Sequence, residues 1–210
     1  MISREYFENK ISNFDESTVL IPCVNGEKEN GKIIKTRFEI DKTDISKFCK
    51  YKFISMNTLF LASVILTLNK FNSCDEILIY YDENIPFATK LENKDITIKE
   101  FLTKTNESLQ ETDVHKSYPV KELLNEYNLK PEFYYGFNES LKNPSEITYS
   151  NYLNITDEYK SIIISFFYND LLYSEEYIEL FLKCIEIIIQ QIANSEIDNM
   201  TIENILKAKD

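Results

Sequence analysis

The chain has 210 residues, 43% of them hydrophobic and 13% aromatic, which is enough for one domain with its own apolar core. Its 23 Lys and Arg residues against 35 Asp and Glu give a net charge of -12. No basic run is long enough to follow a phosphate backbone, so we expect no nucleic-acid partner.

The first half of the chain alternates between helical and strand-like hydrophobic periods. In chain order, the pattern predicts a helix over 5–11, a strand over 32–40, a helix over 55–71, a strand over 76–81 and a helix over 96–111. The segment 55–71 is apolar on nearly all sides, which is typical of a helix packed in the centre of a domain.

The second half continues the alternation. Pro119 is expected at the first position of a short helix that runs to 127, and strands are expected over 132–137 and 161–168. Ser174 is expected to cap a long helix, with Glu175 and Glu176 in its first turn. This order predicts an α/β fold, an α+β sandwich in which helices cover a mixed sheet.

Cysteine spacing and apolar length indicate a cytoplasmic protein. Cys23, Cys49, Cys74 and Cys184 form no C-x-x-C pair, which favours reduced thiols over a disulfide or a metal site. The N-terminus turns acidic at once and lacks the apolar core of a signal peptide. The longest apolar stretch, 59–68, is about half of the ~20 residues that a membrane span needs, so we expect no membrane association.

The residues that most enzymes use are scarce. His115 is the single histidine, placed by the pattern in the loop before Tyr118 and Pro119, so a His-His motif and a multi-histidine metal site are excluded. Three glycines are too few for a phosphate-binding loop, so we expect no cofactor bound directly by this chain. We expect His115 to hold neighbouring backbone by hydrogen bonds, with a role as general base as the alternative.

Two short strings and the order of elements resemble a known family. HKSYPVKELL at 115–124 resembles the His-Gln-x-x-Pro-Phe segment of nonribosomal peptide synthetase condensation domains, and it contributes His115, Tyr118 and Pro119. KPEFYYGF at 130–137 resembles that family's Asn-Pro-Leu-Phe strand and contributes Pro131 and Phe133. The helix at 55–71 and the strand at 76–81 also resemble the family, so the likeness covers nearly the whole chain.

The resemblance implies that residues 1–210 form the C-terminal lobe of a condensation domain, with a chloramphenicol acetyltransferase-like fold. The family's catalytic HHxxxDG motif belongs to the N-terminal lobe, and nothing here resembles that lobe. The implied partners are an N-terminal condensation lobe, peptidyl carrier proteins whose phosphopantetheine arms carry the substrates, and an adenylation domain, because 192–209 resembles the family's last helix and the start of the linker to such a domain. The implied role is a tunnel wall and carrier docking for amide-bond formation.

The chain departs from the family pattern at three places. A long loop and its asparagine are replaced by the short connection from Tyr81 to Phe87. Lys116 stands where the family has glutamine, and Lys130 stands where it has asparagine. Any polar contacts that those family residues make are therefore not expected in the same form.

Two other functions remain open from the sequence. One is a free-standing acyltransferase that uses His115 with a carboxylate, in a cleft completed by another copy of the chain. The other is a non-catalytic module that binds carrier proteins or a partner chain. The charge of -12 opposes long-range attraction to acidic carriers, although Lys28, Lys32, Lys35 and Arg37 form a local basic patch.

Overall fold

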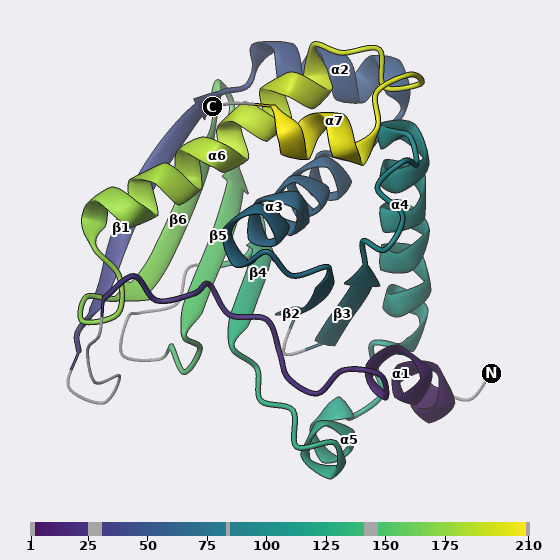
Figure 1. The fold of residues 1–210 in the computed structure, drawn as a ribbon, viewed down its shortest axis with the longest axis vertical. Helices are drawn as coiled ribbons and strands as arrows, with labels where there is room; N and C mark the ends of the chain where they lie inside the picture. The colour runs from purple at the N-terminus through teal and green to yellow at the C-terminus, as the bar shows by residue number, and fades with distance from the viewer. Residues whose placement is uncertain (1–2, 25–30, 83–84, 141–146, 209–210) are drawn as a thin grey trace.

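The computed structural model describes residues 3–24, 31–82, 85–140 and 147–208. Its centre is a six-stranded sheet with the strand order β1-β6-β5-β4-β2-β3, shown in Figure 1. The strands are β1 (Ile33–Asp41), β2 (Glu76–Tyr81), β3 (Ile85–Lys90), β4 (Phe133–Phe137), β5 (Asn151–Asp157) and β6 (Ser161–Asn169). In the described ranges the helices are α1 (Ser3–Ile11), α2 (Thr43–Lys52), α3 (Met56–Asn72), α4 (Ile98–His115), α5 (Val120–Glu126), α6 (Glu175–Ala193) and α7 (Ile202–Lys207).

The sheet combines antiparallel and parallel pairing. β6 is antiparallel to both β1 and β5, and β2 is antiparallel to β3, whereas β4 lies parallel to both of its neighbours, β5 and β2. Parallel neighbours need a crossover connection, and β2 is joined to β4 through β3, α4 and α5. This mixed sheet covered by helices confirms the α/β fold class expected from the sequence.

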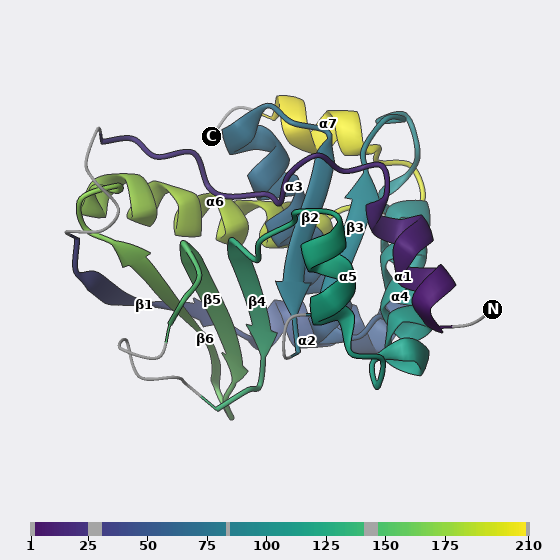
Figure 2. The ribbon, with the colours of Figure 1, turned by 90° about the horizontal axis from the view of Figure 1, so that it is seen from below.

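Two long helices pack side by side on one face of the sheet, as Figures 1 and 2 show for α3 and α6. Every residue of α3 from 58 to 69 is buried, so the expected central helix is confirmed. The hydroxyls of Ser63 and Thr67 are satisfied inside this helix, because each donates to the carbonyl four residues earlier at 2.8 Å. On α6, Phe181 packs against Phe166 of β6 and Phe133 of β4.

The opposite face of the sheet carries a row of aromatic rings. Cross-strand pairing aligns Phe167, Tyr152 and Tyr134, whose successive ring centroids are 5.2 Å and 5.1 Å apart. The start of the β4–β5 connection folds over these rings, because Glu139 accepts hydrogen bonds from the Tyr134 hydroxyl (2.9 Å) and from Asn154 (3.1 Å). Glu139 thus ties the start of this connection to β4 and β5 on this face.

The junction of β2 and β4 is completed by the segment that follows α1. The two strands are paired at one position, Tyr80 with Tyr134. Thr18 lies beside β2, where its N–H donates to the Leu78 carbonyl and its Oγ1 accepts from the Leu78 N–H, both at 2.9 Å. The N-terminal segment thus supplies partners for β2 backbone groups at this junction.

Two of the expected boundaries were wrong. The helix expected over 96–111 is α4, which begins after a capping box formed by Thr97 and Glu100 and continues to His115. His115 is therefore the last residue of a helix and not part of a loop. Pro119 precedes α5 as its N-cap and is not the first helical residue. α4 runs on because 112–115 contains no glycine or proline to end it.

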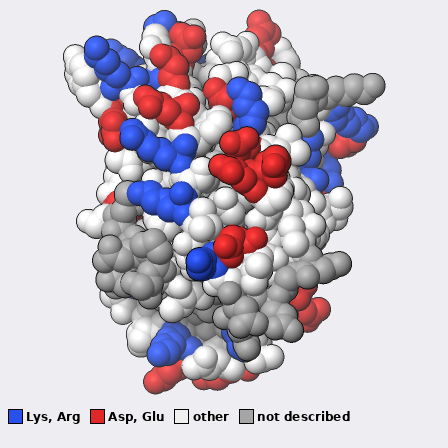
Figure 3. All heavy atoms as spheres, turned by 90° about the vertical axis from the view of Figure 1, so that its left-hand side faces the viewer, with Lys and Arg blue, Asp and Glu red and all other residues white. Residues whose placement is uncertain are grey.

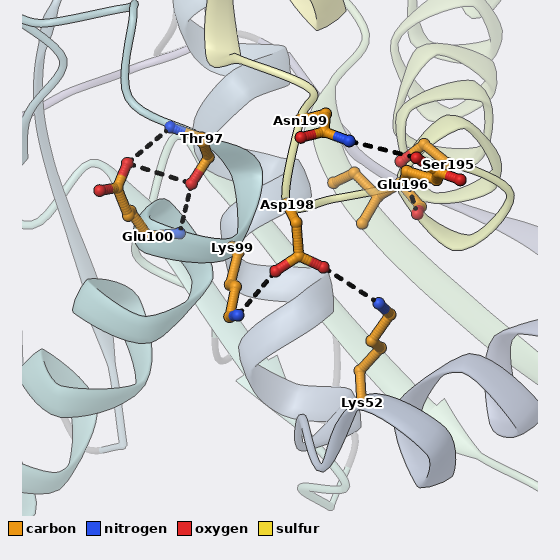
Figure 4. Close-up of polar contacts among 9 residues, drawn as sticks. Lys52, Thr97, Lys99, Glu100, Ser195, Glu196, Asp198 and Asn199 are labelled. Atoms are coloured by element: carbon orange, nitrogen blue, oxygen red, sulfur yellow. Dashed lines mark hydrogen bonds and ion pairs between the residues drawn. The ribbon is translucent and has the colours of Figure 1, made fainter.

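One carboxylate joins three helical regions at the corner drawn in Figure 4. Asp198, in the connection between α6 and α7, accepts from Lys99 of α4 at 2.6 Å and from Lys52 of α2 at 3.4 Å. Hydrogen bonding and charge from Lys99, with a smaller contribution from Lys52, hold the pKa of Asp198 below its usual value. The corner fixes the connection against α2 and α4.

Within the described ranges, no single helix combines the length and apolar composition that a membrane crossing needs, although α2 and α3 do so as a pair bent by 108°.

Candidate functional site

A groove of about 1160 Å³ lies between the α4–α5 connection and the chain that enters β4. Its walls include Tyr118 and Pro119 on one side and Pro131 and Glu132 on the other. The two strings that resemble the condensation family therefore meet across one groove, in which Pro119 and Pro131 are 12 positions apart in the chain.

The first wall is held in place by α1. Arg4 forms an ion pair of 2.5 Å with Glu126 at the end of α5, and this contact lowers the pKa of the Glu126 carboxyl. The hydroxyl of Tyr127 donates to Glu8 at 3.0 Å, and the ring of Tyr118 stacks on Phe7 with centroids 6.0 Å apart. α1 thus positions α5 and the Tyr118 ring against the rest of the domain.

The second wall is built where the chain enters β4 and β5, two interior strands of the sheet. Glu132 accepts a short hydrogen bond from Ser150, which ties the chain before β4 to the chain before β5. Tyr149 packs on Tyr134 with ring centroids 4.8 Å apart, and it also lines the groove. Phe133 belongs to the core instead, because it is fully buried on the helix-covered face.

The groove is locally more basic than the chain as a whole. Lys116, Lys121 and Lys130 line it together with two carboxylates, Asp82 and Glu132. The Lys116 ammonium lies 3.7 Å from the carboxylate of Asp82, which follows β2. This ion pair links the α4–α5 connection, at the rim of the groove, to the β2–β3 hairpin. Two of the three lysines are the residues that replace the family's glutamine and asparagine.

His115 points away from the groove toward α1. Its Nδ1 is 3.1 Å from the Ser3 hydroxyl, and its ring stacks on Tyr6 at a centroid distance of 4.3 Å and an interplanar angle of 24°. Its carbonyl accepts from the Tyr118 N–H at 3.0 Å, which shapes the turn into the groove. These contacts favour a structural role, and the residue does not line the groove that its neighbours form.

The chemistry available in the groove is binding and orientation. Its lining residues offer lysine ammonium groups, a serine and a threonine hydroxyl, and apolar surface, but include neither histidine nor cysteine. In the part of the chain that the structure describes, no group of three or more His, Cys, Asp or Glu side chains is suited to hold a metal ion. The groove can therefore hold a polar or anionic chain.

The sequence did not single out Asp82 or Tyr149 as site residues. Asp82 reaches the rim because β2 and β3 form a tight hairpin in which Tyr81 pairs with Ile85. The shortened connection between Tyr81 and Phe87 was the signal for this position. Tyr149 gave no comparable signal.

The basic patch expected near β1 is described only in part, since Lys28 lies outside the described residues. Lys35 projects over the ring of Phe167, with Nζ 5.6 Å from its centroid. Figure 3 looks onto the side of the molecule that carries β1 and shows Lys and Arg interleaved with Asp and Glu. The visible charges therefore form no field of a single sign.

No protein-family model and no curated protein sequence matches the chain. Solved structures do match it. The condensation domain of the monacolin K polyketide synthase MokA aligns with a TM-score of 0.74 at 13% identity, over 95% of this chain and 58% of that one. The X-domain of teicoplanin biosynthesis, solved in complex with OxyB, aligns with a TM-score of 0.78 at 13% identity, over 99% and 56%. The starter condensation domain of rhizomide synthetase, solved with C8-CoA and Leu-SNAC, aligns with a TM-score of 0.74 at 11% identity, over 96% and 53%.

The chain spans a little over half the length of these structures. At identities this low the likeness establishes the fold, and the fold is that of condensation domains and X-domains. Nearly complete coverage of this chain with about half coverage of the matches is what one lobe of a two-lobed domain gives. The expected resemblance to the C-terminal lobe, with its chloramphenicol acetyltransferase-like fold, is confirmed at this level.

Proposed function

We propose that this chain is the C-terminal lobe of a condensation-type domain of a nonribosomal peptide synthetase. In this role it forms one wall of the substrate tunnel and part of the carrier-docking surface, and an N-terminal lobe with the HHxxxDG motif supplies the proton transfer. The observation that carries the proposal is the coverage, which is nearly all of this chain but about half of each matching condensation domain.

The groove between Tyr118 and Pro131 supports a positioning role. Carrier proteins would present substrates as thioesters on phosphopantetheine arms, and two tethered reactants held in register react as if in one molecule. Such positioning can be worth several kcal/mol without any proton transfer by this lobe. The lysines of the rim and the absence of histidine and cysteine from the groove lining fit binding better than catalysis.

The test is reconstitution. The chain would be mixed with an N-terminal condensation lobe that carries the HHxxxDG motif and with two carrier proteins loaded with aminoacyl thioesters, and the dipeptidyl product would be followed by mass spectrometry. We expect product only when both lobes are present. Product formed by this chain alone, or by the N-terminal lobe alone at the full rate, would contradict the proposal.

A variant pair tests the groove itself. Ser117 is exposed and lines the groove, so Ser117→Trp should fill it and reduce product formation at least 10-fold without changing the melting temperature. Ser12 is also exposed but lies outside the groove lining, so Ser12→Trp is the matched control and should retain full activity. Equal activity in the two variants would mean that substrates do not pass through this groove.

One observation favours a second function. The X-domain that shares this fold was solved in complex with OxyB, so a domain of this architecture can serve as a docking partner. A complex of this chain with a partner protein that forms without any condensation activity in the reconstituted system would favour this reading.

A further inference from the structure

The free edge of β1 is the part of the sheet best suited to pair with another strand. β1 ends the strand order, and Figures 1 and 2 show no described helix beyond its outer side. It is nine residues long and pairs with β6 along its whole length without a break in register. An unpaired edge of this length is a template for a further strand.

One hydrogen bond shows which residues of β1 direct their backbone N–H and C=O groups away from β6. The Asp170 N–H donates to the Lys32 carbonyl at 3.0 Å, so Lys32 and Asp170 form a hydrogen-bonded pair of the antiparallel ladder. Such pairs alternate, so the even-numbered residues of β1 bond to β6 and the odd-numbered residues direct their N–H and C=O groups outward. The outward set is 33, 35, 37, 39 and 41.

The side chains of this outward set carry an ordered charge pattern. Lys35 and Arg37 are positive, Glu39 and Asp41 are negative, and all four are exposed. Pairing with β6 places Lys35 opposite Phe167, so the four charges lie on the sheet face opposite to α3 and α6. In the described part of the chain, neither Arg37 nor Glu39 forms an ion pair.

We infer that β1 pairs antiparallel with β1 of a second copy of this chain, about a two-fold axis at Phe38. In this register Lys35 faces the second copy's Asp41, Arg37 faces the second copy's Glu39, and the same two contacts recur across the axis. The odd-numbered residues face each other, so their outward N–H and C=O groups form the new ladder. The two Phe38 side chains, each half-buried, meet on the axis.

Neighbouring registers are disfavoured by the same charges. A shift that centres the pairing on Arg37 places the two Arg37 side chains opposite each other, and a shift that centres it on Glu39 does the same with two Glu39 side chains. Like charges directly opposite one another destabilise a strand pair. A shift by one residue would oppose outward and inward backbone groups and lose the ladder.

The association should be weak and reversible. In this register seven strand residues from each copy (35–41) are paired, which is fewer than the 20 to 30 of a standard interface, so we expect a dissociation constant on the order of 10–100 µM. The net charge of -12 on each copy opposes the approach of two chains at long range. At 0.15 M salt, charges more than about 8 Å apart are largely screened. The electrostatic contribution to dimer formation therefore comes mainly from the oppositely charged pairs that face each other across the interface.

A charge-swap experiment tests the pairing. Sedimentation of the full chain from about 5 to 500 µM, a span chosen to bracket the expected dissociation constant, should show a monomer–dimer equilibrium. Arg37→Glu and Glu39→Arg should each weaken it at least 10-fold, because each variant faces itself with like charges. An equimolar mixture of the two variants should dimerise again, since opposite charges then face each other. Lys104→Glu on α4 changes the net charge as Arg37→Glu does and should leave the dimer unchanged.

A cysteine cross-link tests the register independently of the charges. In a chain with Cys23→Ser and Cys74→Ser, Phe38→Cys should oxidise to a covalent dimer, whereas Thr36→Cys, which faces Ile40 of the second copy, should not. A wild-type chain that stays monomeric to 500 µM overturns the inference, as does a mixture of the two charge variants that remains monomeric. Equal cross-linking at 36 and 38 overturns it as well.

Discussion

Replacing His115 by alanine separates a structural histidine from a catalytic one. The substitution removes the hydrogen bond between Nδ1 and the Ser3 hydroxyl (3.1 Å) and the stacking on Tyr6 (4.3 Å). It keeps the backbone bond to Tyr118. A part-buried hydrogen bond and a stacked ring pair each contribute about 0.5–1.5 kcal/mol, so we expect a loss of about 1–3 kcal/mol. For a chain of this size that lowers the melting temperature by roughly 2–12 °C.

The assay pairs thermal melting with acyl transfer from a thioester-loaded carrier. Val114→Ala is the matched control, because Val114 is the preceding residue of α4 and is 76% exposed, and we expect it to melt within about 2 °C of the wild type. His115→Phe keeps the stacking and should lose only the hydrogen-bond part. If the isolated wild-type chain transfers acyl groups and His115→Ala abolishes this at an unchanged melting temperature, the structural reading of His115 is wrong.

Three further predictions concern the frame around the groove. Leu61 is 1% exposed in α3, so Leu61→Asp should yield no soluble protein while Leu61→Met expresses normally, as a solubility assay on both would show. Thr97→Ala removes the α4 capping box and should cost about 0.5–2 kcal/mol in urea denaturation, and an unchanged midpoint would mean that the cap is not needed. Lys99 and Lys52 lower the pKa of Asp198 in the folded chain, so its stabilising effect is present above the unfolded pKa of about 3.9 and is lost as pH falls through the folded value. The stability difference between the wild type and Asp198→Asn should therefore shrink from pH 7 to pH 3, and a difference that grows on acidification would refute this sign.

The elements found from the sequence are those whose hydrophobic period and caps agree. α3 follows Ser55, whose hydroxyl accepts from the Thr58 N–H at 3.0 Å, and it is apolar on every side. β6 carries a dense apolar run and pairs on both sides. In α6 the Ser174 cap and the acidic first turn were both as expected. In these elements the hydrophobic pattern of the sequence predicts the same secondary structure that the packing of the folded domain requires.

The elements that were missed are those in which tertiary structure overrides a weak local pattern. β5 has the sequence NYLNITD, in which two asparagines interrupt the apolar pattern of a buried strand. Asn151 and Asn154 are nevertheless fully buried, and hydrogen bonds to surrounding groups satisfy some of their polar atoms. Gly136 opposite Asn154 makes room for this, since a Cβ there would lie 2.5 Å from Asn154 Oδ1. β3 contains Pro86 and reads as a loop, but it lies at the edge of the sheet, where proline is tolerated.

The candidate site was found only in part. The resemblance brought attention to Tyr118, Pro119 and Pro131, which do line one groove. It also grouped His115 and Phe133 with them, because each is within three positions of a groove residue. His115, however, points to α1, and Phe133 points into the core. Sequence adjacency cannot distinguish these directions, because a turn or a strand sends successive side chains to different sides.

The placement of Thr18 and Leu20 has a consequence for how the chain assembles during synthesis. Leu20 receives the Tyr173 hydroxyl on its carbonyl, 153 positions along the chain, and its N–H donates to Asn151, 131 positions along. The segment that completes β2 at Leu78 is thus made early, yet it cannot settle until the start of α6 has left the ribosome. We therefore expect this junction to close late in folding, because its contacts join residues 131 and 153 positions apart.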